Sequence, residues 1–397
     1  MDPRELKAKA AITGLGITPM GRIYGRSADW FAAEAIRLAV EDAGLGKRDI
    51  DGLLVNQGVT PLSGMGGLGI QNHLGLTNLR LLASLNVGGA TANIMVQYAA
   101  LWVIYGFATN VVCVFADAPL RQGSGGGAAY GGAFARQLQP RGMSGLYTAF
   151  GMAGVNAQYA LAARRHMAMY GTTNDHFGAV AVAQRQWAAM NPLAERREPI
   201  TLEEYHASRW VVEPLHLLDC CLVSNGGVAV VVSRADRARD LRQPPVYVWG
   251  WGQGHPGDLR RKGWDVETQT GAPMAKEQAF GMAEIDITDV DVLELYDCYT
   301  YTVIVTLEDY GFCPKGEGGP FVADGKLGPG GTLPTNTGGG QLSGYYMWGM
   351  TPLSEAVIQA RGHGGARQAD RHDLVLVSGN GGILDHHSTL ILSPLPS

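Results

Sequence analysis

The chain has 397 residues, of which 46% are hydrophobic and 17% are charged, a balance typical of a globular protein that buries a large core. This composition excludes a disordered chain, a collagen-like chain and a coiled coil. The 31 basic and 36 acidic residues give a net charge of −5, so the sequence lacks the basic field that would hold nucleic acid or an anionic membrane.

The five cysteines form no CxxC pair, and no His/Cys/Asp spacing indicates a metal site. Cysteines without a disulfide framework are typical of a reducing compartment. The segment Met1–Leu6 lacks the charged and apolar regions of a signal peptide, and no run approaches the roughly 18 apolar residues of a membrane span. These features predict a soluble, cytoplasmic protein.

Glycine is twice as frequent as usual: 56 of 397 residues is about 14%, against a usual share of about 7%. The glycines gather beside predicted helices and strands, where they permit a close approach of backbone to backbone or to a ligand. No GxxxxGK[ST] motif occurs, and no GxGxxG motif opens a helix in a βαβ unit, so a nucleotide-phosphate site is not expected.

The first predicted elements are a helix, a strand and a second helix. Ser27 is the predicted N-cap of a helix with one apolar stripe, and Gly44 lies where that helix should end. A strand is predicted at Ile50–Asn56. The next helix, from about Gly89 to Tyr105, is apolar on nearly every side, which is typical of a helix in the middle of a domain.

Two hydrophobic runs, Val111–Ala116 and Gly227–Ser233, predict strands covered on both faces. Between them lies a long insertion, from about 117 to 225, with a helix predicted at Asp175–Met190. An insertion of this length is typical of a functional segment, and two interpretations stay open: a cap over an active site or a dimerisation arm.

The second half repeats the plan of the first. Its predicted elements are two helices and three strands: strand Asp291–Tyr296, helix Thr300–Tyr310, helix Pro352–Ala360, strand Leu374–Ser378 and strand Ser388–Ser393, with a short turn at Gly379–His387. The repetition predicts an α/β fold made by internal duplication, and Pro244–Pro245 marks the boundary. We therefore expect an N-terminal half at 1–243, insertion included, and a C-terminal half at 244–397.

Several motifs resemble the thiolase superfamily, specifically the sterol-carrier-protein-type thiolase-like proteins that are also called lipid-transfer proteins. They follow in the family's order: YDCY at Tyr296–Tyr299, GFCPKGEGG at Gly311–Gly319, LPTNTGGGQLSG at Leu333–Gly344 and SGNGGIL at Ser378–Leu384. The resemblance implies a five-layered αβαβα thiolase fold, an obligate homodimer and acyl-CoA thioester substrates.

The residues at the family's catalytic positions depart from the thiolase pattern. Asn86, in the stretch SLNVGG, stands where a thiolase has its nucleophilic cysteine, and Ser378 stands where it has its last acid/base cysteine. Tyr296 and Tyr346 replace the two catalytic histidines. Cys298 is the nearest thiol and is interpreted as structural. Without a nucleophilic thiol no acyl-enzyme can form, so thiolytic chemistry is not expected.

Two tyrosines in place of two histidines resemble the thiolase-like aldolases that shorten steroid side chains. A phenol with a pKa of about 10 donates a proton at neutral pH, and a neighbour that lowers this pKa lets it accept one. The resemblance implies retro-aldol cleavage of a 17-hydroxy C22 steroid acyl-CoA to a 17-ketosteroid and propionyl-CoA. Tyr296 is assigned as base and Tyr346 as acid. Tyr345 is the alternative to Tyr346, because a misalignment by one residue would exchange them.

The remaining candidates would bind the substrate. Asn86, or backbone donors around Gly381 in the Gly379–Gly382 turn, would hold the enolate oxygen. Arg260 and Arg261 would meet the CoA phosphates, although such a cluster is also typical of a solvated loop. His386 either faces the site or caps the turn. Ser378 is the last of the residues predicted to bind the substrate.

The resemblance also implies a small separate partner, built of an OB-fold and a zinc ribbon, that joins the homodimer as a heterotetramer. No cofactor is expected beyond the coenzyme A of the substrate. Two other functions stay open: a non-catalytic acyl-CoA- or lipid-binding scaffold, and a thiolase-like enzyme acting on another acyl-CoA. The discriminating observation is whether the hydroxyls of Tyr296 and Tyr346 meet in one site.

Overall fold

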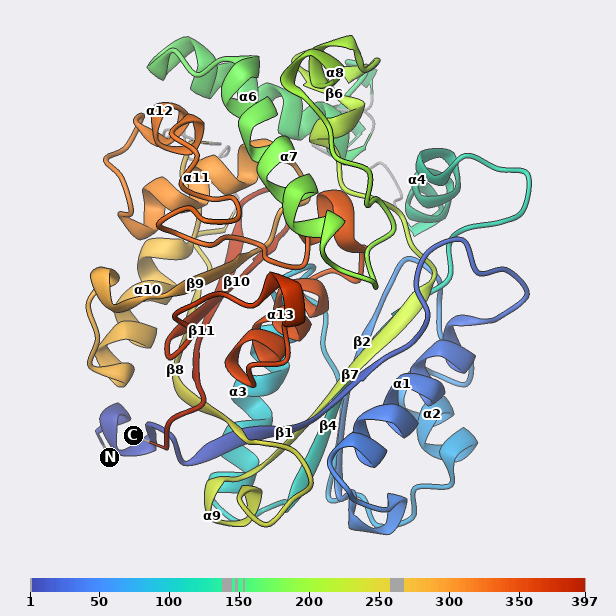
Figure 1. Ribbon diagram of the computed structural model, residues 1–397. Helices are drawn as coiled ribbons and strands as arrows, with labels where there is room; N and C mark the ends of the chain where they lie inside the picture. Colours follow the sequence, from blue (N-terminus) through green and yellow to red (C-terminus); the bar gives the residue numbers. More distant parts are fainter. Residues whose placement is uncertain (1, 138–144, 147–148, 153, 258–267, 397) are drawn as a thin grey trace.

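The computed structural model describes residues 2–137, 145–146, 149–152, 154–257 and 268–396. Nine strands form one sheet: β1 (Ala10–Ile17), β2 (Gly52–Gln57), β3 (Leu81–Ser84), β4 (Asn110–Asp117), β7 (Gly226–Arg234), β8 (Val246–Gly254), β9 (Val292–Leu295), β10 (Val375–Gly381) and β11 (His386–Ser393). Their order across the sheet is β3-β2-β4-β7-β1-β8-β11-β10-β9 (Figure 1). A separate two-stranded hairpin is formed by β5 (Trp210–Val212) and β6 (Leu215–His216).

The two halves of the sheet have the same pairing pattern. In the first half, β2 is parallel to β4, β4 is antiparallel to β7, and β7 is antiparallel to β1. In the second half, β9 is parallel to β10, β10 is antiparallel to β11, and β11 is antiparallel to β8. Antiparallel pairing of β1 with β8 joins the halves. The predicted duplication is confirmed, whereas the boundary at 243/244 stays a prediction.

Helices form three layers around the two halves of the sheet. The helices are α1 (Ala28–Asp42), α2 (Gly67–Leu74), α3 (Thr91–Ile104), α4 (Gly126–Gln137), α6 (Val155–Tyr170), α7 (Asn174–Ala189), α8 (Leu202–Ala207), α9 (Ala235–Ala238), α10 (Ala272–Ala283), α11 (Thr300–Tyr310), α12 (Gly318–Ala323) and α13 (Met350–Ala360). The central helices α3 and α13 share one core with strands of both halves. Helices α1 and α2 cover the outer face of the first half, and α10 and α11 cover that of the second (Figure 1). The five-layered αβαβα fold is therefore confirmed.

The predicted elements lie close to the observed ones. Ser27 caps α1 by accepting the backbone N–H of Trp30 at 3.2 Å, and Gly44 follows the helix with a φ of +73°. Helix α3 is buried on nearly all sides, as its composition predicts. The turn predicted at Gly379–His387 is wrong in extent, because β10 continues to Gly381 and β11 begins at His386.

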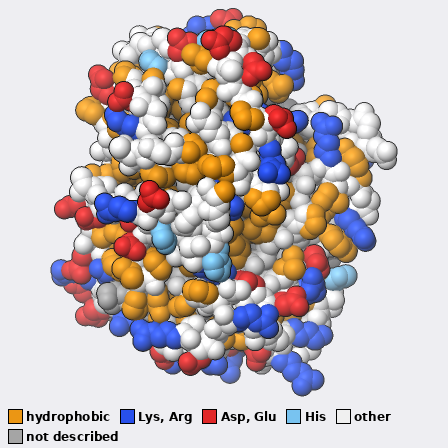
Figure 2. Space-filling model, viewed as in Figure 1, with side chains coloured by type: hydrophobic (Ala, Val, Ile, Leu, Met, Phe, Trp, Pro, Cys, Tyr) orange, Lys and Arg blue, Asp and Glu red, His pale blue; other side chains and the backbone are white. Residues whose placement is uncertain are grey.

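The insertion between β4 and β7 contains α4, α6, α7, α8 and the β5–β6 hairpin, at the top of Figure 1. Helix α7 packs against α11 and α12 of the second half. Figure 2 shows hydrophobic side chains gathered across the middle of this face, between the insertion and the rest of the molecule below it. Within the described residues, no helix is both long and apolar enough to cross a membrane.

Glycines bring one strand of each half against the backbone of a helix. A Cβ on Gly16 of β1 would lie 2.2 Å from the carbonyl oxygen of Ala35 in α1, and one on Gly250 of β8 would lie 2.1 Å from that of Ala279 in α10. Such distances leave no room for a side chain, so these strand glycines set the spacing between sheet and outer helices.

We expect Gly250→Ala to lower the free energy of unfolding by about 2–3 kcal/mol, because its methyl group would force β8 away from α10. Gly281→Ala is the matched control: it changes the same residue type on α10 itself, in open space. The control should gain about 0.5–1 kcal/mol by restricting the unfolded chain. Thermal denaturation followed by circular dichroism measures both, and equal effects of the two variants would contradict the packing argument.

Candidate active site

Equivalent turns lead into the two central helices. The backbone N–H of Val87 donates to the hydroxyl of Thr91 at 2.7 Å, and the backbone N–H of Met347 donates to the hydroxyl of Thr351 at 2.9 Å. Each turn contains one residue with positive φ, Gly88 at +57° in the first and Trp348 at +48° in the second. The duplication therefore extends to the start of α3 and α13.

Asn86 and Tyr346 occupy equivalent positions in these turns, directly before the two N–H donors. The side chain of Asn86 is exposed, and its oxygen accepts the backbone N–H of Gly88 at 3.1 Å. Tyr346 is buried, and its own backbone N–H donates to the hydroxyl of Ser224 at 2.9 Å. The two positions thus differ in solvation: one side chain stabilises its own turn, and the other enters the interior.

Four glycines form the contact between the two turns and β10, and we call them the glycine junction: Gly89, Gly349, Gly379 and Gly381. A Cβ on Gly349 would lie 2.2 Å from the carbonyl oxygen of Gly89, and one on Gly381 would lie 1.9 Å from that of Val87. The predicted site residue Gly381 therefore packs its backbone against the turn that carries Asn86. A Cβ on Gly89 would lie 2.0 Å from Cε2 of Tyr296, so the ring of this tyrosine rests on the junction.

The structure brings Tyr296 and Tyr346 together. Tyr296 follows the end of β9 and Tyr346 precedes α13, and both side chains are buried. Burial raises the pKa of Tyr296 well above its ordinary value, and a hydrogen bond with the side chain of Tyr346 opposes that rise. The two predicted catalytic tyrosines therefore belong to one site: the ring of Tyr296 rests on Gly89, and Tyr346 precedes the turn that meets Gly89 through Gly349.

The insertion adds a third phenol to this pair. The hydroxyl of Tyr130, on α4, lies 3.4 Å from the hydroxyl of Tyr346, with the rings edge to face at 5.8 Å. The indole Nε1–H of Trp348 donates to the hydroxyl of Tyr130 at 3.0 Å. A chain of hydrogen-bonding groups therefore runs from Trp348 through Tyr130 to Tyr346.

A second pair of tyrosines lies beside the first. Tyr159, on α6 of the insertion, packs its ring 4.5 Å from that of Tyr299 and donates its hydroxyl to the carbonyl of Gly382 at 3.2 Å. Asn380 donates its side-chain amide to the same hydroxyl at 3.3 Å. Because α4 and α6 each place a tyrosine at the site, these contacts favour the cap interpretation of the insertion over the dimerisation arm.

The electrostatics of the site disfavour negative charge. Burial raises the pKa of Tyr346 well above its ordinary value, and the neighbouring Tyr130 and Tyr296 raise it further. Burial likewise raises the pKa of Tyr159 and Tyr299. In the protein without substrate all four phenols are therefore neutral at physiological pH, and a phenolate at this site needs hydrogen-bond donors.

The thiols near the tyrosines are not activated. Burial raises the pKa of Cys298 to about 12, and it raises the pKa of Cys221, next to Tyr346, well above its ordinary value. A neutral, buried thiol is a poor nucleophile, which agrees with the structural interpretation of Cys298. Within the described ranges, no three or more His, Cys, Asp and Glu side chains are grouped so as to hold a metal ion.

Two other predicted residues lie away from the tyrosine pair. Tyr345 hydrogen-bonds with Ser354 of α13 at 2.7 Å, so Tyr346 and not Tyr345 is the tyrosine that faces Tyr296. The hydroxyl of Ser378 lies 2.9 Å from Nε2 of His387, on the sheet face that α10 and α11 cover. Burial lowers the pKa of His387 to about 3, so this imidazole is neutral, and the bond belongs to the core.

His386 lies at the rim of the site. Its Nδ1 is 3.2 Å from Nδ1 of His255, and its ring approaches Gly382, whose carbonyl accepts the hydroxyl of Tyr159. Arg260 and Arg261 lie outside the described residues.

Sequence reasoning missed Tyr130, Tyr159 and Trp348. Tyr130 is the one aromatic side chain in the glycine-rich stretch GGGAAYGG, and Trp348 lies two residues after Tyr346. Both facts are visible in the sequence, but a packing role for an aromatic residue is more common than a site role. Only the fold shows that both side chains converge on Tyr346.

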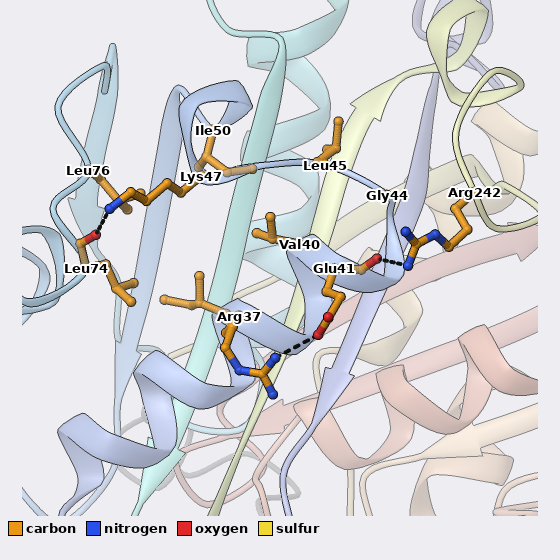
Figure 3. Close-up of a pocket in the computed structure, with 11 residues that line it drawn as sticks. Arg37, Val40, Glu41, Gly44, Leu45, Lys47, Ile50, Leu74, Leu76 and Arg242 are labelled. Atoms are coloured by element: carbon orange, nitrogen blue, oxygen red, sulfur yellow. Dashed lines mark hydrogen bonds and ion pairs between the residues drawn. The ribbon is translucent and has the colours of Figure 1, made fainter.

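A pocket of about 380 Å³ lies elsewhere (Figure 3). It is bounded by α1, the segment after α2 and Arg242, on the outer face of the first half. Its polar groups bind one another: Arg37 pairs with Glu41 at 2.7 Å, and Arg242 donates to the carbonyl of Glu41 at 2.8 Å. Neither Tyr296 nor Tyr346 lines this pocket.

Comparisons with known proteins agree with this architecture. The family model described as thiolase C-terminal domain-like matches residues 259–394. A steroid side-chain-cleaving aldolase of Thermomonospora curvata is 39% identical over 95% of this chain and 96% of its own length. A 17-hydroxy-3-oxo-4-pregnene-20-carboxyl-CoA lyase of Mycobacterium tuberculosis is 37% identical over 90% of this chain and 92% of its own.

Among solved structures, one described as the Ltp2-ChsH2(DUF35) aldolase superposes with a TM-score of 0.86, at 37% identity and 98% coverage of both chains. The expected resemblance is confirmed along nearly the whole sequence. The chain therefore belongs to the thiolase superfamily, among its sterol-carrier-protein-type thiolase-like proteins.

Proposed function

We propose that this protein is a carbon–carbon lyase that cleaves the side chain of a 17-hydroxy C22 steroid acyl-CoA, releasing a 17-ketosteroid and propionyl-CoA. The observation that carries the proposal is that the glycine junction holds Tyr296 and the turn of Tyr346 at one buried site, where the thiol of Cys298 is not activated. The names of two relatives, which cover nearly the whole chain, support the same substrate class.

The proposed reaction needs one base and one acid. The phenolate of Tyr296 takes the proton of the C17 hydroxyl as the C17–O bond becomes a carbonyl. The bond between C17 and the α-carbon of the thioester breaks, and its electron pair forms the thioester enolate. The phenol of Tyr346 then gives its proton to that carbon and becomes a phenolate.

The contact between the two tyrosines returns the site to its starting state. After one turnover Tyr296 holds a proton and Tyr346 lacks one, so a single transfer between their hydroxyls resets both. No proton from solvent, metal ion or redox cofactor is needed, and the atoms balance. The coenzyme A of the substrate is the only cofactor-like group in the proposal.

The scaffold function is the rival that the structure disfavours. A binding protein without catalysis has no need of two buried phenols at the glycine junction, because burying a hydroxyl costs free energy of desolvation. The hydroxyl of Tyr346 lies within hydrogen-bond distance of Tyr130.

We further propose that the protein works as a homodimer in complex with a separate small partner made of an OB-fold and a zinc ribbon. The support is the superposition on a solved structure described as the Ltp2-ChsH2(DUF35) aldolase, a description that names two components. The five free cysteines support a reducing compartment, and we place the protein in the cytoplasm.

Tyr296→Phe and Tyr346→Phe should each lower kcat by about 10²–10⁴-fold, because each removes one proton-transfer group. Tyr345→Phe is the matched control, since it deletes a buried hydroxyl one residue away that bonds with Ser354. Mass spectrometry of the ketosteroid and propionyl-CoA measures turnover. Near-normal turnover in both site variants would refute the mechanism, and thioester binding by a wild-type protein that never cleaves it would establish the scaffold function.

The kcat/KM of the wild-type enzyme should rise with pH. Burial raises the pKa of Tyr296, so below that pKa the fraction of active phenolate increases about tenfold per pH unit. A profile of kcat/KM between about pH 6 and pH 9 measures the slope. A flat profile, or one that falls across this range, would contradict a tyrosine base.

Co-expression with an OB-fold/zinc-ribbon protein should yield a complex larger than the homodimer on size-exclusion chromatography. We expect cleavage activity to rise in that complex, because the partner completes the acyl-CoA site. Full activity of the isolated chain, with no change on adding the partner, would contradict this expectation.

A further inference from the structure

The indole of Trp348 determines the direction of the hydrogen-bond chain at the site. An indole N–H can donate but cannot accept, so at 3.0 Å the oxygen of Tyr130 must be its acceptor. The indole itself is held in place: its ring stacks on Phe115 with centroids 5.1 Å apart, and Trp348 adopts a φ of +48° in the turn before α13.

The hydroxyl of Tyr130 can therefore still donate its own proton. Its hydroxyl lies 3.4 Å from the hydroxyl of Tyr346, at a distance where either oxygen could be the donor. Because the oxygen of Tyr130 already accepts from Trp348, we assign its O–H as the donor to Tyr346. The proton of Tyr346 is then free to point away from Tyr130.

We propose that Tyr130, supplied by the insertion, is a positioning residue of the cleavage reaction, which aims the proton of Tyr346 and stabilises the phenolate that Tyr346 becomes. This inference rests on the proposed function and extends it to a third tyrosine. When Tyr346 has protonated the enolate, the O–H of Tyr130 still points at its oxygen, and the charge is held until Tyr296 returns a proton.

The surroundings make this donor necessary. The titratable groups that face Tyr346 are Tyr130, Tyr296, Cys221 and Cys298, and it is the negative charge of their ionised forms that raises its pKa, whereas a neutral O–H donor lowers it. Tyr130 faces Asp117 and Cys221, which raise its own pKa. None of these named groups carries a positive charge, so a phenolate here depends on O–H and N–H donors.

The matched variants are Tyr130→Phe, which removes the donor, and replacement of Tyr130 by difluorotyrosine, which keeps the shape and makes the O–H a stronger donor. Tyr130→Phe should lower kcat about tenfold with KM nearly unchanged, and should move the rising limb of the pH profile upward by about one unit. Difluorotyrosine should move the limb to lower pH. Tyr345→Phe controls for loss of a buried hydroxyl and should leave the limb in place.

A second measurement keeps this inference apart from the proposed function. Monofluorotyrosine at position 346 reports its own protonation by fluorine NMR, with no need for turnover. Its titration should move to higher pH when Tyr130→Phe is added. A wild-type enzyme without lyase activity would refute the proposed function alone, whereas an unchanged titration, or a pH limb that stays in place in both Tyr130 variants, would refute the role of Tyr130.

Discussion

The close approach of three backbone segments at the glycine junction is the constraint on which the site depends. The turns before α3 and α13 meet each other and β10 at distances that no side chain tolerates. Because Gly89 has no Cβ, the ring of Tyr296 can lie directly on the turn that in the thiolase pattern carries the nucleophile. One glycine therefore connects the packing of the two halves to the placement of the proposed base.

Burial then decides which chemistry such a site can support. Burial at the site raises the pKa of the tyrosines and of Cys298. A buried thiol without a cationic neighbour is inert, whereas phenols that donate to one another can share a proton. In the proposed mechanism, a chain of hydrogen bonds takes the place of the covalent intermediate of a thiolase. Burial leaves the thiol of Cys298 inert, and it also strengthens these hydrogen bonds.

Sequence reasoning succeeded where the hydrophobic pattern was unbroken and failed where glycine interrupted it. Helix α3 and strands β4 and β7 have continuous apolar residues, and they were predicted within a few residues of their bounds. Strands β1 and β8, which join the halves, were not predicted. Their glycines face the backbones of α1 and α10, so the positions that should be most hydrophobic carry no side chain at all.

The sequence by itself determined the family and the duplicated fold, because motifs in the family's order lie along nearly the whole chain. It also predicted the loss of the nucleophilic cysteine and the two tyrosines at the histidine positions. Only the tertiary structure decided that Tyr346 rather than Tyr345 meets Tyr296, and that Tyr130 and Trp348 join them. The physical reason is that a hydrogen bond depends on the direction of a side chain, and residues 130, 296 and 346 lie far apart in the chain. Their convergence comes from the packing of the insertion and the two halves, which no local pattern encodes.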